Sequence, residues 1–379
     1  MNLKRYGWAG LAILALLWAV WSITGRSHSF TSADLEIEQV YNISGEAICE
    51  RNVVGIQPFM ITEDYLSEQQ FQAKMSGYFE EAGKAGFLRD KTIVLLPEYL
   101  GTWLVINGEK ESVASYADIQ SAMGVMILSN PINFIRSYLD HGEESDKVAA
   151  SLFRMKSADM AAIYSRVFRN LASTFNVTIV AGSIVLPGPA VQQNEIVVSS
   201  KQTLYNASFV FYPDGSIDPH IVRKSYPIAS ELPFLKSAPI DSLPLFHLHG
   251  TSAAVLVCAD SWYPDSYKMV DSLDAALILV PSYCTGEGTM AKKWKGYDGG
   301  AMPEDVDKED VGRISEGEAW ARYALPGRMA RSKAKAGVNV FLRGKLWDLG
   351  SDGQPFFVRE GQLLNVPASE KAGIWNLCF

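Results

Sequence analysis

The sequence is poor in the side chains that bind metals or cross-link a small fold. It has four cysteines among 379 residues, far apart and without a C-x-x-C pair. This spacing indicates neither a zinc site nor a dense disulfide framework. There are five histidines, and the pair in HLH at 247–249 has no visible third ligand to complete a metal site. We therefore expect no metal centre, and the pairing of Cys49, Cys284 and Cys378 stays open.

Basic charge is scarce as well. The chain carries 34 Lys and Arg against 42 Asp and Glu, which gives a formal net charge of −8, and it has no long basic stripe. This balance argues against a nucleic-acid partner. Internal repeats and low-complexity segments are absent. With 48% hydrophobic and 20% charged residues, the composition is instead typical of a globular protein with a large core.

One hydrophobic run, at the N-terminus, predicts contact with a membrane. Lys4 and Arg5 precede an uncharged run over 6–25, and Arg26 follows it. The run has the length of a transmembrane helix and contains tryptophans suited to the interface. A cleaved signal peptide is the alternative, but no A-x-A-like site follows the run. We predict an uncleaved single-pass anchor over 1–26 that holds the rest of the chain outside the cytosol.

The remainder of the chain is typical of one α/β domain. After a linker over 27–48, the domain is predicted to span 49–365 and to end in a C-terminal tail over 366–379. Strand, helix and hairpin patterns alternate along it. Strands are predicted at 52–59, 91–98, 177–189, 251–258, 275–283 and 337–344, a hairpin at 203–227, and helices within 62–86, 157–175, 263–275 and 318–336.

Two long segments interrupt this alternation. The first, 105–145, contains the apolar, proline-interrupted stretch SAMGVMILSNPINFIRSYL, for which a lid, an interfacial helix and ordinary core all remain open. The second, 284–317, is rich in glycine and charge and resembles an irregular loop after a strand end. Binding sites are often built in such loops.

Three reactive side chains stand at or just beyond the carboxyl ends of predicted strands. Glu98 ends TIVLLPE, Lys224 follows the hairpin in IVRK, and Cys258 ends AAVLVC. Because sites in α/β sheets collect at the carboxyl ends of strands, the three can converge although the sequence separates them. Taken singly, each has an ordinary structural interpretation. A buried cysteine in particular is usually inert.

Together the three residues suit nucleophilic catalysis. A thiol is mostly protonated near neutral pH, so it needs a base or a neighbouring cation. Glu98 can serve as the base. Lys224 and the backbone N–H of Ala259 can stabilise the oxyanion that forms when sulfur attacks a carbonyl or nitrile carbon. The product of that attack is a covalent thioester on Cys258.

Five ordered motifs carry a resemblance to the nitrilase superfamily of carbon–nitrogen hydrolases over about residues 50–362. They are LLPEYLGTW, YNASFVFYPDGSI with VRKSYP, VLVCADSWYPD, LILVPSY, and RMARSKAKAGVNVFLRG with SDGQP. The resemblance implies a catalytic triad of Glu98, Lys224 and Cys258. It also implies a four-layer α-β-β-α sandwich that commonly pairs through its sheets into a homo-oligomer, and it implies no metal or organic cofactor.

A fourth residue of the family pattern, a second acid after the lysine, falls on Glu231 in KSYPIASE. The match is looser here, because the segment is one residue shorter than the common form and carries Tyr226 where His-Leu is usual.

Three functions remain open. The first is a membrane-anchored amidase-type hydrolase that cleaves a non-peptide C–N bond of a small amide or acyl substrate. The second is acyl transfer, because apolipoprotein N-acyltransferases resemble this domain, although they use several membrane helices. The third is a degenerate, membrane-tethered binding module, which would not need an intact trio. The sequence favours the first of these and does not identify the substrate.

Overall fold

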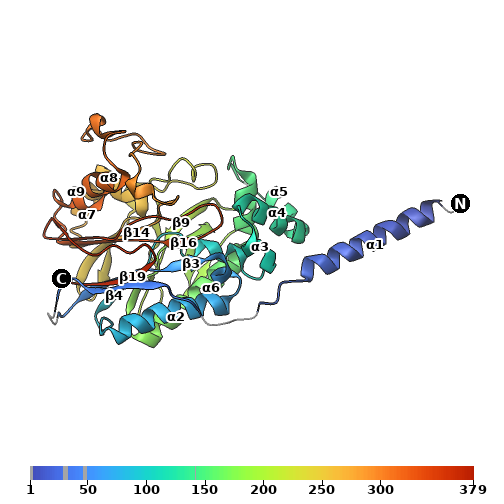
Figure 1. The fold of residues 1–379 in the computed structure, drawn as a ribbon, viewed down its shortest axis with the longest axis horizontal. Coiled ribbons are helices and arrows are strands. Elements are labelled where there is room, and N and C mark those ends of the chain that lie inside the picture. Colours follow the sequence, from blue (N-terminus) through green and yellow to red (C-terminus); the bar gives the residue numbers. More distant parts are fainter. Residues whose placement is uncertain (1–2, 29–32, 46–48, 141) are drawn as a thin grey trace.

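The computed structural model describes residues 3–28, 33–45, 49–140 and 142–379. Two large sheets lie between helices on either side (Figure 1). The first sheet has the strand order β1 (Ile37–Asn42), β19 (Ala372–Cys378), β2 (Asn52–Gln57), β4 (Thr92–Leu95), β5 (Thr178–Val180) and β10 (Val210–Phe211). The second has the order β12 (Phe246–Leu248), β13 (Thr251–Val255), β14 (Leu277–Ser282), β15 (Ala336–Phe341), β17 (Phe356–Arg359) and β18 (Gln362–Leu364).

Smaller strand groups and the helices complete the fold. A three-stranded sheet consists of β11 (Val222–Arg223), β9 (Leu204–Ser208) and β6 (Ile184–Pro187), and two pairs join β16 (Arg343–Lys345) to β3 (Phe59–Ile61) and β7 (Ala190–Gln192) to β8 (Glu195–Val197). The α-helices are α1 (Leu3–Ile23), α2 (Glu68–Lys84), α3 (Glu111–Ser115), α4 (Ile119–Ser129), α5 (Pro131–Leu139), α6 (Lys147–Phe175), α7 (Pro264–Ser272), α8 (Glu316–Tyr323) and α9 (Leu325–Met329).

Neighbouring residues of β2 belong to two different cores, as the pleat of a strand requires. Val54 packs in the core that contains α2 and α6, whereas Val53 packs in the core of the second sheet and its helices. The next residue, Gly55, lets the two sheets approach closely, because a Cβ there would lie 2.7 Å from the Cγ1 of Val340 on β15. The order of layers is therefore helix, sheet, sheet, helix, in agreement with the predicted α-β-β-α sandwich.

Three helix boundaries differ from the predicted ones for local reasons. The helix expected after Thr62 begins at Glu68, because Ser67 caps it by accepting a hydrogen bond from Gln70 N at 3.2 Å. Helix α6 begins at Lys147, ten residues earlier than expected, behind an Asp146 cap. The helix expected over 318–336 is broken at Ala324 into α8 and α9, and a proline that cannot donate a backbone hydrogen bond lies in the first turn of α9.

The predicted domain boundaries are wrong, because the segments expected to be a linker and a C-terminal tail both contribute strands to the first sheet. Strand β19 pairs in parallel with β1 on one side and antiparallel with β2 on the other. All seven residues of β19 are buried, so this segment is a central strand of the sheet. The domain therefore begins no later than Ile37 and includes Cys378.

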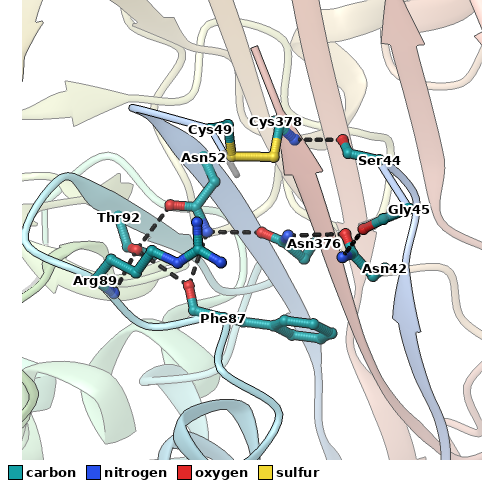
Figure 2. The surroundings of a disulfide bond; sticks show 10 residues. All are labelled: Asn42, Ser44, Gly45, Cys49, Asn52, Phe87, Arg89, Thr92, Asn376 and Cys378. Carbon is teal, nitrogen blue, oxygen red and sulfur yellow. Dashed lines mark hydrogen bonds between the residues drawn. A yellow bond between two sulfur atoms is a disulfide. The ribbon is translucent and has the colours of Figure 1, made fainter. Parts of the chain in front are cut away.

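A disulfide joins Cys49 to Cys378 beside this central strand (Figure 2). The Cα atoms are 5.6 Å apart. Figure 2 shows the hydrogen bonds around it, among them the Cys378 N–H that donates to Ser44 Oγ at 2.8 Å. Asn52 and Asn376, on adjacent strands, are joined through their side chains at 2.6 Å. The bond thus fastens the chain that leads into β2 to the end of β19.

Helix α1 projects from the body of the molecule (Figure 1). Its C-terminal part contacts α4, where Trp18 Nε1 donates a hydrogen bond to the carbonyl of Leu128 at 2.9 Å. It ends at Ile23, before Gly25 turns the chain at a φ of +76°, so it stops two residues before the end of the predicted apolar run. Within the described ranges, no helix combines the length and apolarity needed to cross a membrane. The predicted transmembrane anchor over 1–26 is therefore not supported.

Loss of the disulfide should lower the free energy of unfolding by about 2–4 kcal/mol, because the bond restricts the unfolded chain. The two cysteines are 329 residues apart, so the closed loop is long. Denaturant unfolding of Cys49→Ser and Cys378→Ser measures the loss. The double variant should lose no more than either single variant, since all three lack the same bond. Losses of stability that add up in the double variant would contradict this account. So would a wild-type unfolding midpoint that reduction with dithiothreitol leaves unchanged.

Candidate active site

Three strand ends place the predicted reactive residues together. Glu98 lies three residues beyond β4, Lys224 directly follows β11, and Cys258 lies three residues beyond β13. Lys224 Nζ is 2.8 Å from Glu98 Oε1 and 2.7 Å from Glu231 Oε2. The fourth residue of the sequence pattern, Glu231, is thus in direct contact with the lysine despite its looser motif. All four side chains are buried and line one cavity.

The lysine is held as a cation by its two carboxylates. Burial alone would lower the pKa of Lys224, but Glu231 and Glu98 together hold it well above its usual range. Burial raises the pKa of Glu98, Lys224 opposes that rise, and Glu231 adds to it. An ion pair this deep is costly to desolvate and persists because each charge has partners. The cluster therefore carries one ammonium between two carboxyl groups.

Cys258 lies against this cluster in a strained turn. It is the first residue of a short 3-10 helix over Cys258–Trp262, and its φ of +50° falls in the left-handed region, which side chains other than glycine rarely adopt. Its Sγ contacts the Glu98 carboxyl group and donates to the carbonyl of Tyr283 at 3.7 Å. Burial, and then Glu98, raise the pKa of the thiol well above its usual range. The resting sulfur is therefore protonated, with Glu98 beside it.

Asp260 connects the turn that contains Cys258 to the backbone that follows Lys224. Its Oδ1 accepts hydrogen bonds from the backbone N–H groups of Ser225 and Tyr226 at 2.9 and 2.8 Å, and its Oδ2 accepts from Val257 N at 3.2 Å. Burial raises the pKa of Asp260 to about 7, against the lowering effect of Lys224 and the three N–H groups. One carboxyl group thus fixes the positions of the residues that follow Lys224 and precede Cys258.

Three partners of the carboxylates were missed by the sequence analysis. Asn206 Nδ2 donates to Glu98 Oε1 at 2.8 Å, and the Tyr283 backbone N–H donates to Glu98 Oε2 at 3.1 Å. The Tyr99 hydroxyl donates to Glu231 Oε1. Tyr283 could have been found, because it follows the end of β14 as Glu98 and Cys258 follow theirs. Asn206 lies in the middle of β9, inside the motif YNASFVFYPDGSI, but nothing in that motif assigned it a role at the site.

The cavity that contains these residues measures about 990 Å³. Both long segments of the sequence line it. From the first, α4 contributes Met126 and its neighbours, so the core interpretation holds for the inner side of that helix, whereas α5 has no buried residue. From the second, the loop after Tyr283 contributes Cys284, whose thiol is not disulfide-bonded, and Glu316 at the start of α8. Ala259, the predicted oxyanion donor, also lines the cavity.

Metal-ligating side chains do not gather in this cavity or elsewhere in the described part of the chain. There, no three His, Cys, Asp or Glu residues lie in a group that could hold a metal ion. The chemistry available at the site is that of a thiol, a carboxyl group and an ammonium.

Comparison with known proteins identifies the family. The profile of the carbon–nitrogen hydrolase family matches residues 92–297, more than half of the sequence. The chain therefore belongs to the carbon–nitrogen hydrolase family, and the predicted family is confirmed. A search of curated protein sequences finds no match.

Solved structures show the same mixed α/β fold at low identity. A carbon–nitrogen hydrolase from Helicobacter pylori G27 superposes with a TM-score of 0.52 at 17% identity, over 86% of this chain and 87% of that one. An amidase from Nesterenkonia sp. gives 0.50 at 16%, over 87% and 91%. A mutant of the amidase from Nesterenkonia sp. AN1, with acrylamide added to its active-site cysteine, gives 0.50 at 14%, over 87% and 93%.

We expect Asp260→Asn to destabilise the protein by about 1–3 kcal/mol, because the amide cannot accept all three buried N–H groups and leaves one unsatisfied. Asp265→Asn is the matched control, since that carboxylate lies nearby on α7 and is largely exposed. Its change should stay within about 0.5 kcal/mol. Denaturant unfolding measures both. Equal, small losses would show that Asp260 does not join the two loops.

Proposed function

We propose that this protein hydrolyses a carboxylic amide through a thioester on Cys258. The contact that carries the proposal is that of the Cys258 thiol with Glu98, whose carboxyl group is in turn bonded to Lys224. A buried, protonated thiol is a poor nucleophile until a base removes its proton. Glu98 is the carboxyl group in contact with the sulfur and is suited to be that base.

The first half-reaction forms the thioester. Cys258 Sγ attacks the amide carbon while its proton passes to Glu98. The oxyanion is stabilised by Lys224 and by the backbone N–H of Ala259. The C–N bond then breaks, and Glu98 gives its proton to the departing amine.

The second half-reaction regenerates the enzyme. Water attacks the thioester carbon and passes a proton to Glu98, the C–S bond breaks, and the sulfur recovers that proton. The sum is amide plus water giving carboxylic acid plus amine, with no other reactant.

Glu231 has a positioning role in this scheme. Its Oε2 accepts a hydrogen bond from Lys224 Nζ and another from the Ile228 N–H, each at 2.7 Å. Because the lysine then has a partner at each carboxylate, its ammonium is held in place and stays charged.

The similar structures support hydrolysis over acyl transfer. Two of the three are described as amidases, and in one of these the active-site cysteine carries a covalent adduct. None of them favours the N-acyltransferase alternative. The family match supports an enzyme over a binding module.

The Cys49–Cys378 disulfide supports placing the domain in an oxidising compartment outside the cytosol. Such bonds persist there and are rare in the cytosol of most organisms.

Cys258→Ala should abolish release of amine or ammonia from amides that the wild type hydrolyses, because it removes the thiol that lies beside Glu98 and would carry the thioester. Cys284→Ala is the matched control, since it removes the other unpaired thiol that lines the same cavity. It should retain turnover. If Cys258→Ala retains full turnover, or if Cys284→Ala alone loses it, the proposal is wrong.

Glu98→Gln should lower kcat by about 10²–10⁴, the usual contribution of a general base. Glu231→Gln makes the same change in the other carboxylate that contacts Lys224. We expect a smaller loss there, because Glu231 acts through the lysine and does not contact the sulfur. Steady-state kinetics under the same conditions compares the two. An equal or larger loss in Glu231→Gln would contradict the assignment of Glu98 as the base.

A further inference from the structure

The cavity is much larger than a simple amide requires. Its volume of about 990 Å³ is at the upper end of the range for sites that enclose drug-sized ligands, about 300–1,000 Å³. An amide of about five heavy atoms needs only about 150 Å³, at roughly 30 Å³ for each atom the size of water. Most of the cavity therefore lies beyond the reacting atoms and is available to the rest of the substrate.

One end of the cavity is apolar and buried. Ile106, Ala122, Met126 and Leu152 line it, and none is more than 2% exposed. Asp146 also lines the cavity, but its carboxylate is occupied in capping α6 through Ala149 N at 3.0 Å, and the polar side chain that α4 adds to the lining, Gln120, is exposed. Against the four buried apolar side chains, a polar substrate group would lose its water without gaining a partner. An aliphatic chain would gain from burial.

The lining supplied by the loop after β14 and by α8 is mixed, because charged side chains that reach solvent stand there beside the rings of Trp294, Tyr297 and Trp320. Three lysines of this loop line the cavity with exposed side chains: Lys292, Lys293 and Lys295. Glu316 lies on the same side, with a pKa that burial raises to about 7. Cys258 lines the same cavity, so a substrate bound at the sulfur can extend toward the apolar end and toward these lysines.

We propose that the substrate is an amphiphilic amide, with an aliphatic chain on one side of the scissile bond and a polar group on the other. The chain occupies the apolar end beneath α4, and the polar group lies among the lysines. This inference rests on the proposed hydrolysis and specifies its substrate class. The long segment over 105–145 then contributes to substrate binding, because its helix α4 forms one wall of the apolar end of the cavity.

The test measures hydrolysis of two series of soluble amides by the full-length protein. In the first series the acyl group lengthens from acetyl to dodecanoyl, and in the second the substrates are acetamides of lengthening alkylamines. Every substrate is used below the concentration at which it forms micelles. We expect kcat/KM to rise by about fourfold per added methylene in one of the series until the apolar end is filled. If short amides are hydrolysed through Cys258 and kcat/KM stays flat or falls with length in both series, the inference is overturned while the proposed function stands. If no amide is hydrolysed, both fail.

A matched pair of variants locates the chain. Met123 on α4 lines the cavity, whereas Met155 on α6 does not, and both are half-buried against the same core. Met123→Trp should lower the ratio of long-chain to short-chain kcat/KM by at least tenfold and move the optimum to shorter chains. Met155→Trp should keep the wild-type ratio. The placement of the aliphatic chain beneath α4 would be overturned if Met123→Trp left the ratio of long-chain to short-chain kcat/KM unaltered. It would also be overturned if both variants lowered that ratio equally.

Discussion

The buried contact of Lys224 with two carboxylates is the constraint on which the site depends. With an ammonium between Glu98 and Glu231, none of the three charges is left without a partner, although all three side chains are buried. Removal of one partner from a buried ion pair typically costs about 3–5 kcal/mol, so the three side chains hold one another in position. Burial, and then the neighbouring Glu98, raise the pKa of Cys258, which explains why the thiol keeps its proton at rest. A thiolate here would be stabilised by Lys224 but opposed by burial and by Glu98.

The fold serves this cluster by bringing together chain segments that are far apart in the sequence. The ends of β4, β11, β13 and β14 supply Glu98, Lys224, Cys258 and the backbone of Tyr283. They meet because the two large sheets pack face to face, closely enough that β2 needs a glycine opposite β15. Asp260 then fixes two of the four segments relative to each other through the backbone. The loops beyond these strand ends form the cavity, so substrate choice can vary without disturbing the cluster.

The sequence predicted the local features and missed those that depend on distant partners. Apolar runs that end in Glu98 and Cys258 identified both strands and their reactive ends, because burial on both faces leaves a plain pattern in the sequence. The C-terminal strand was missed, since its place between β1 and β2 follows from pairing across more than three hundred residues and from no local pattern. Asn206 shows the same limit. It stands in an N-x-S sequence that suits glycosylation, yet the structure buries its amide against Glu98.

The central claim is that the acyl group becomes attached to the sulfur of Cys258. The most direct measurement is to quench the wild-type protein in acid during turnover of an amide, and to locate any added mass by peptide mass spectrometry. The account predicts an increase equal to the acyl group on the peptide that contains Cys258, removed by hydroxylamine as a thioester is. Product release with no adduct in a single turnover, or an adduct on Cys284 or another residue, would contradict it.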